Sequence, residues 1–154
     1  MCKLFTGAFF FTMRSCEYLK VSGERRTKIV SLKNNRFFKG KRELNHSDPN
    51  LSSASIGSIT FELQKKDEKN DTVTHHRSNH KVICPVITWA KIVKHIRRYP
   101  DSSDSSTVNT YKDKNGSTHL LSGPNLLKQI RLAAAAISHK TLSFHPKDIG
   151  LHSA

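Results

Sequence analysis

The chain has 154 residues, enough for one domain with a hydrophobic core and too few for two domains of ordinary size. Its 26 lysine and arginine residues outnumber 12 aspartate and glutamate residues, which gives a formal net charge of +14. An excess of this size indicates a polyanionic partner, most simply nucleic acid, although an anionic membrane surface would also attract it. No stretch approaches 18 uncharged apolar residues, so no membrane-spanning helix is expected.

The cysteines and the first residues bear on the compartment. Cys2, Cys16 and Cys84 are widely spaced and form no CxxC pair, which favours reduced thiols in the nucleus or cytoplasm. A short apolar run near the start could pass for a secretory signal, but Arg14 and Glu17 follow it at once, without a small-residue cleavage site. We therefore expect no signal peptide and a nuclear or cytoplasmic location.

The hydrophobic pattern predicts an α+β domain over residues 1–154, mainly α-helical with a small antiparallel β-sheet. Residues 4–19 have the pattern of one helix with a broad apolar face. The β-branched run at 27–32 predicts a strand, and a second short strand is expected at 36–39. Residues 45–57 are polar and contain a proline, so a loop is expected there.

A β-hairpin is predicted next. Residues 58–64 alternate as a strand should, with Ile59, Phe61 and Leu63 on one face, and 72–76 return as the second arm. The connection between the arms is densely charged.

The second half should hold two helices and a second hairpin. A helix is expected from Pro85 to about Arg98, with Trp89 on its buried stripe and a basic opposite face. Asn115-Gly116 is the strongest hairpin signal in the chain and predicts a pair of strands on either side. Residues 125–138 predict another amphipathic helix, and Pro146 can open a last one. The basic face of the first helix consists of Lys91, Lys94, Arg97 and Arg98.

Metal binding is an alternative that the histidines raise. His76, His80 and Cys84 repeat every four residues, which on one helix would put three ligands on one face. The pattern predicts a strand and a turn there, and no second ligand pair has the required spacing. The sequence therefore predicts no metal and no other cofactor.

Arg14 is the residue that most needs an explanation. It follows an apolar run and precedes Glu17 by three residues, the spacing of neighbours on a helix. A guanidinium in that setting needs a carboxylate, other acceptors or an anion in a cleft. The alternative is that both residues lie at the solvent edge of the helix and form an ordinary surface ion pair.

Three segments in order resemble the tyrosine recombinases, or phage integrases, of eukaryotic mobile elements. MRSCEY, with Arg14 and Glu17, resembles the first family box, and the hairpin over 59–76 resembles the one that carries the catalytic lysine. Lys65 is the best match for that lysine, with Lys66 or Lys69 as alternatives. HPKDIGLHS resembles the start of the second box, which places its histidine at His152.

The resemblance implies breakage and rejoining of double-stranded DNA through a 3′-phosphotyrosyl intermediate. Arg14 would hold the phosphate with Glu17 supporting it, Lys65 would protonate the leaving oxygen, and His152 would assist proton transfer. In the full-length family the partners would be double-stranded DNA and other copies of the protein on it. The basic patch between residues 20 and 42 is expected to bind the DNA backbone through Arg25, Arg26, Lys28, Lys33 and Arg36, together with Lys66.

The chain departs from the family pattern at its end. The second arginine would fall just after Ala154, and Tyr18, Tyr99 and Tyr111 all precede the second box, so none matches the nucleophile. We therefore expect a fragment that is catalytically incomplete. Two alternatives stay open: a noncatalytic basic nucleic-acid-binding module, and a small ribosome-associated or chromatin-type basic protein. In either, the hairpin lysines would be solvated turn residues and His152 an ordinary, partly buried histidine.

Overall fold

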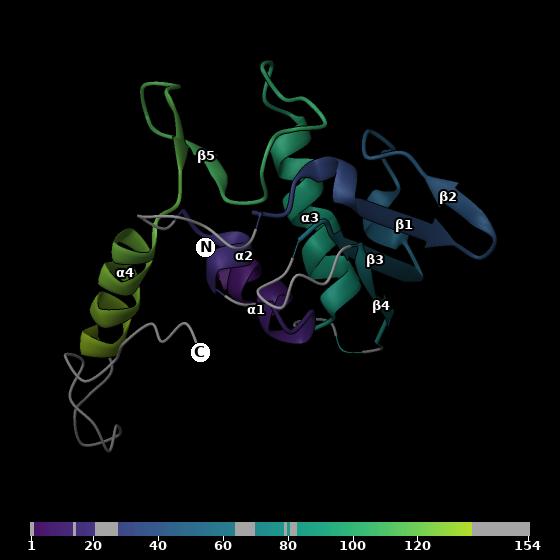
Figure 1. The fold of residues 1–154 in the computed structure, drawn as a ribbon, viewed down its shortest axis with the longest axis horizontal. Coiled ribbons are helices and arrows are strands. Elements are labelled where there is room, and N and C mark those ends of the chain that lie inside the picture. Colours follow the sequence, from purple (N-terminus) through teal and green to yellow (C-terminus); the bar gives the residue numbers. More distant parts are fainter. Residues whose placement is uncertain are drawn as a thin grey trace.

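Two antiparallel sheets and four helices make up the described part of the chain (Figure 1). The computed structural model describes residues 2–13, 15–20, 28–63, 70–78, 80 and 83–136. In chain order its helices and strands are α1 (Cys2–Phe10), α2 (Ser15–Tyr18), β1 (Asn35–Lys39), β2 (Arg42–Leu44), β3 (Ile56–Phe61), β4 (Asp71–His76), α3 (Pro85–Arg97), β5 (Thr110–Lys112), β6 (Thr118–Leu120) and α4 (Gly123–Ala136).

The fold is α+β, but the expectation of a mainly helical domain is wrong. The structure is 37% helix and 26% strand, so neither class of secondary structure dominates. The larger sheet has four strands in the order β2-β1-β3-β4, and every neighbouring pair is antiparallel. The smaller sheet is the β5–β6 hairpin. The sequence pattern did not predict β2, because this strand has only three residues and no apolar alternation.

Helix α3 joins the helical part of the molecule to the larger sheet. It contacts α1 and also strands β3 and β4 (Figure 1). Pro85 opens it, as expected, because a proline at the first helical position has no amide hydrogen to leave unpaired. The predicted buried stripe is confirmed, since Trp89 and Val93 are fully buried and Ile96 is nearly so.

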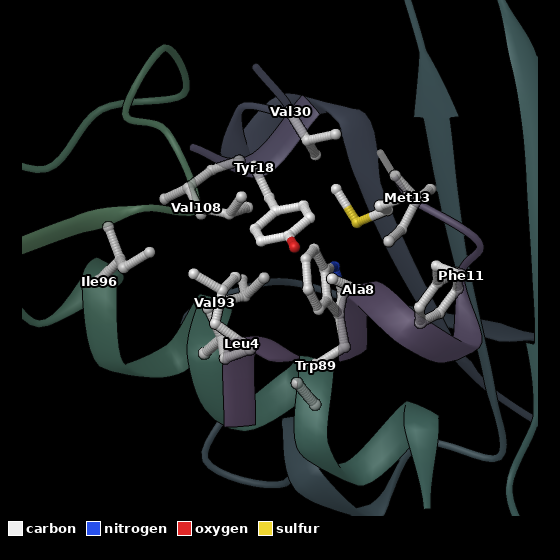
Figure 2. Packing of buried hydrophobic residues seen from close by; sticks show 14 of the residues in the cluster. Leu4, Ala8, Phe11, Met13, Tyr18, Val30, Trp89, Val93, Ile96 and Val108 are labelled. Carbon is white, nitrogen blue, oxygen red and sulfur yellow. The ribbon is translucent and has the colours of Figure 1, made fainter. Parts of the chain in front are cut away.

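The core is centred on Trp89, where α1 and α3 meet (Figure 2). A Cβ atom at Gly7 would lie 2.3 Å from Cε3 of the indole ring, so only glycine allows this approach of the two helices. Phe11 packs against the same ring with their centroids 5.6 Å apart. Leu4, Ala8, Met13, Tyr18, Val30, Val93, Ile96 and Val108 surround them.

The predicted hairpins are confirmed in position. Strand β3 pairs with β4 from Ile56 opposite His76 to Phe61 opposite Asp71, which places the charged connection between the two arms. Ile59 and Phe61 are buried on one face. In the second hairpin, Gly116 has a φ of +80°, a conformation that favours glycine.

The strand expected at 27–32 is not formed in its described part. Ser31 makes one isolated bridge to Thr107, and Leu32 begins a 3₁₀ turn that ends at Asn34. The backbone amide of Val30 donates to Glu17, at 2.9 Å, instead of to a neighbouring strand. These residues form a connection whose backbone bonds go to several elements in turn, a pattern that β-propensity does not predict.

Helix α4 is only partly covered. Leu126 and Ala134 are buried, but Ala133 is exposed and Leu132 is 56% exposed. The helix stands beside the β5–β6 hairpin, away from the larger sheet (Figure 1). Ile137 and the helix expected from Pro146 lie outside the described residues.

Candidate nucleic-acid interface

The predicted first helix is divided just before Arg14. Helix α1 ends at Phe10 and α2 begins at Ser15, so the expectation of one helix over 4–19 is wrong. The amide of Met13 donates to the carbonyl of Ala8 at 2.8 Å, and that of Thr12 donates to Phe9 at 3.1 Å. This pair of bonds is a Schellman motif, which ends a helix with one residue in the left-handed conformation.

Thr12 is that residue, with a φ of +52°. Glycine usually occupies this position, because a β-branched side chain is strained there. The signal that would have predicted the helix end is therefore missing from the sequence. Arg14, two residues later, lies outside the described residues.

Glu17 is almost completely buried, with 2% of its surface exposed. The alternative of a surface ion pair at the solvent edge of a helix is therefore wrong for its carboxylate. Burial of a carboxylate is tolerated where polar groups compensate for lost hydration, as expected of a supporting residue and not of an ordinary surface acid. Its backbone carbonyl accepts the amide of Val30, which ties α2 to the connection that follows.

The same connection also contacts the end of β3. The amide of Lys28 donates to the carbonyl of Leu63 at 3.5 Å, and the side chain of Lys28 reaches Glu62 at 3.3 Å. Residues 28–30 therefore lie between α2, which follows Arg14, and Leu63, which precedes the predicted hairpin lysines. Lys65, Lys66 and Lys69 lie outside the described residues, as does His152.

The basic patch expected to bind the DNA backbone is partly neutralised where it is described. Lys33 contacts Glu62 at 2.7 Å, in addition to the longer contact from Lys28. Hydrogen bonds from Lys33 and then from Asn34 are the main causes that lower the pKa of Glu62 to about 2. Arg36 forms two hydrogen bonds to the carboxylate of Glu43, at 2.9 and 2.7 Å.

These pairs give the described part of the patch a mixed charge. Its cations are exposed, so each pair contributes little to stability, but each carboxylate also reduces the local positive potential. Arg25 and Arg26 lie outside the described residues.

A second basic region lies along α3. A groove of about 1170 Å³ is lined by residues of α1, α3, the β5–β6 hairpin and α4. Lys91, Lys94 and Arg98 of the predicted basic face belong to it, whereas Arg97 pairs with Asp104. Lys3 and Lys128 also line the groove, and no sequence pattern predicted them, because single lysines on separate helices form no motif.

In the described ranges, no cluster of side chains supports the alternative of a metal site. His76 is in β4, His80 follows it in a non-helical segment, and Cys84 precedes α3. Among the residues that the structure places, no three His, Cys, Asp or Glu side chains gather as metal ligands would. Cys84 is a buried core residue, as its apolar neighbours indicated.

Comparison with known proteins gave no relative. No family model, curated protein or solved structure matches this chain. Within the described ranges, every helix is too short or too polar to cross a bilayer.

Proposed function

We propose that this chain is a DNA-binding fragment of a tyrosine recombinase or integrase, and that it contributes Arg14, Lys65 and His152 to a phosphate site. The established chemistry of that family is breakage and rejoining of double-stranded DNA through a 3′-phosphotyrosyl intermediate. On this proposal Glu17 is a positioning residue, and the chain acts in DNA recombination or integration of a mobile element.

The supporting observation is the backbone connection between two of the three motif regions. Val30 bonds to Glu17, and Lys28 bonds to Leu63. The segment after Arg14 and the segment before Lys65 are thus held to the same three residues of chain. A phosphodiester reaction needs such convergence, because negative charge grows on the non-bridging oxygens while the leaving oxygen needs a proton.

A second candidate is a noncatalytic basic nucleic-acid-binding module that uses α3. The observation that favours it is the charge of Lys91 and Arg98, neither of which is paired with a carboxylate in the described part of the chain. Binding by such a module depends on charge and on no particular pocket.

The two candidates respond in opposite ways to two substitutions of equal charge. Binding of a 20-base-pair fluorescent duplex is measured by anisotropy for Arg14→Ala and for the matched control Arg98→Ala. Loss of a charge-assisted phosphate contact should weaken binding at least about tenfold for Arg14→Ala. The control should change it much less.

Retained duplex binding in Arg14→Ala, with loss in Arg98→Ala, would overturn the recombinase proposal and favour the noncatalytic module. Circular dichroism of both variants shows whether the fold is kept. Equal weakening by both substitutions would also count against a phosphate pocket at Arg14, since only net charge would then matter.

A further inference from the structure

The groove between α1, α3, the β5–β6 hairpin and α4 is lined by one sign of charge. Among the described residues, its lining contains six lysine, arginine or histidine side chains and no aspartate or glutamate. A concave surface of this kind concentrates positive potential, because the low-dielectric walls focus the field. The six residues are Lys3, Lys91, Lys94, His95, Arg98 and Lys128.

These cations differ from those on the sheet. Lys33 and Arg36 have carboxylates within 3 Å, whereas Lys91, Arg98 and Lys128 form no ion pair with any residue that the structure describes. Lys94 donates to the backbone carbonyl of Pro49 at 2.6 Å, which fixes the side chain and leaves its charge unneutralised. The groove therefore gathers several cations that no described carboxylate neutralises.

The basic side chains along α3 form a continuous row. Lys91, His95 and Arg98 are three and four residues apart, so they follow one face of the helix over about 10 Å. Lys128 of α4 adds a cation from another wall of the groove. An anion that contacts them all must be extended and carry several charges.

The size and concave shape of the groove select among polyanions. Its volume of about 1170 Å³ exceeds the range of roughly 300–1,000 Å³ typical of small-molecule sites. Duplex DNA is contacted by elements that project into its grooves, whereas single strands lie in positively charged channels. A concave groove therefore favours a single strand over a duplex.

The other lining groups suit nucleobases. Asn125 and Gln129, one helical turn apart on α4, are exposed and offer both donors and acceptors. Tyr111 lines the groove with 37% of its surface exposed. Its ring stacks on the ring of His119, with 5.5 Å between the two centroids. His119 therefore covers one face of the Tyr111 ring, and a nucleobase can stack on the other face.

We propose that this groove binds single-stranded nucleic acid, with phosphates on Lys91, Arg98 and Lys128 and a base stacked on Tyr111. The site is separate from the one proposed for duplex DNA, and it does not depend on Arg14 or on recombinase chemistry.

The test uses fluorescein-labelled (dT)20 and a hairpin duplex of equal length, with binding measured by anisotropy at 0.1 M salt. The double variant Lys91→Gln/Arg98→Gln removes two phosphate contacts, each of which releases about 0.7 counterion from a single strand. Its affinity for (dT)20 should therefore fall about 25-fold at this salt concentration, and its salt dependence should be less steep.

The matched control is Lys39→Gln/Lys41→Gln. Both lysines are exposed on the β1–β2 hairpin, at the far end of the molecule from α4 (Figure 1). The net charge changes by the same amount, but screening limits the effect to less than about threefold. Equal weakening by both double variants would overturn the proposal, because binding would then follow net charge alone.

A third variant and a competitor distinguish a nucleic acid from an acidic peptide. Tyr111→Ala should weaken the binding of (dT)20 at least about fivefold, because the stacking of a base on the ring is lost. Poly-L-glutamate at equal charge concentration should displace labelled (dT)20 much less effectively than unlabelled (dT)20 does. Equal displacement by poly-L-glutamate, or an equal loss of (dT)20 binding and hairpin-duplex binding in Lys91→Gln/Arg98→Gln, would overturn the proposal. Arg14→Ala should weaken duplex binding more than (dT)20 binding, so this test can fail while the recombinase proposal stands.

Discussion

Asn35, at the start of β1, is expected to be the most sensitive polar residue of the core. It is 2% exposed, and its side chain accepts the indole hydrogen of Trp89. Its amide nitrogen donates to the carbonyl of Ser31 at 2.6 Å and to that of Leu32 at 3.2 Å. One side chain thus fastens α3 to the connection that approaches the end of β3.

The expected cost of Asn35→Ala follows from which groups lose their only partner. The carbonyls of Ser31 and Leu32 keep backbone partners, the amides of Asn34 and of residue 35 itself. The indole hydrogen of Trp89 is fully buried and would be left unpaired, which costs about 1–3 kcal/mol. With the two lost amide bonds, we expect the free energy of unfolding to fall by about 3 kcal/mol.

The assay is urea denaturation followed by the fluorescence of Trp89, the single tryptophan of the chain. With a slope near 1.5 kcal/mol per molar urea, the midpoint should fall by about 2 M. Asn50→Ala is the control, because that side chain is exposed and makes no capping bond. A fall of less than about 1 kcal/mol in Asn35→Ala, with unchanged Trp89 emission, would refute this account of the core.

Two further predictions concern the end of α1 and the ion pairs of Glu62. Thr12→Gly should raise the free energy of unfolding by about 0.5–1 kcal/mol in the same assay, because glycine relieves the strain of a φ of +52°; a lower stability would contradict the Schellman geometry. Glu62 has a pKa lowered to about 2 from its usual 4.5, so its contribution is present above pH 4.5 and is lost as the pH falls toward 2. Since its partners Lys28 and Lys33 are 65% and 55% exposed, Glu62→Gln should cost only about 1 kcal/mol at pH 7. The difference in the free energy of unfolding between the wild type and Glu62→Gln should vanish near pH 2. A difference that stays constant between pH 7 and pH 2 would argue against the ion pairs.

The sequence predicted those elements whose pattern is local. The periodicity of α3, the alternation of β3 and the Asn115-Gly116 turn each specify an element without reference to the rest of the chain. The break after Phe10 was missed, because threonine stands where glycine would have indicated it. The connection before β1 was missed because tertiary bonds, which have no sequence period, determine its path.

The candidate sites could be predicted only in part. Glu17 is buried, and burial of a residue three places after Arg14 does not follow from spacing. Sequence gives the number of lysines and arginines, but it does not show which ones face a carboxylate. Arg36 and Arg98 look alike in the sequence. Only the fold shows that Arg36 pairs with Glu43 and that Arg98 lines a groove.

This uneven neutralisation gives the described structure an electrical polarity. Cations near β1 are partly compensated by Glu43 and Glu62, whereas Lys91, Arg98 and Lys128 form no ion pair with a described residue. A polyanion approaching from a distance exerts a torque on such a charge distribution before any contact forms. The groove would then turn toward the incoming strand, so association should be fast at low ionic strength and slow markedly when salt shortens the range of the field.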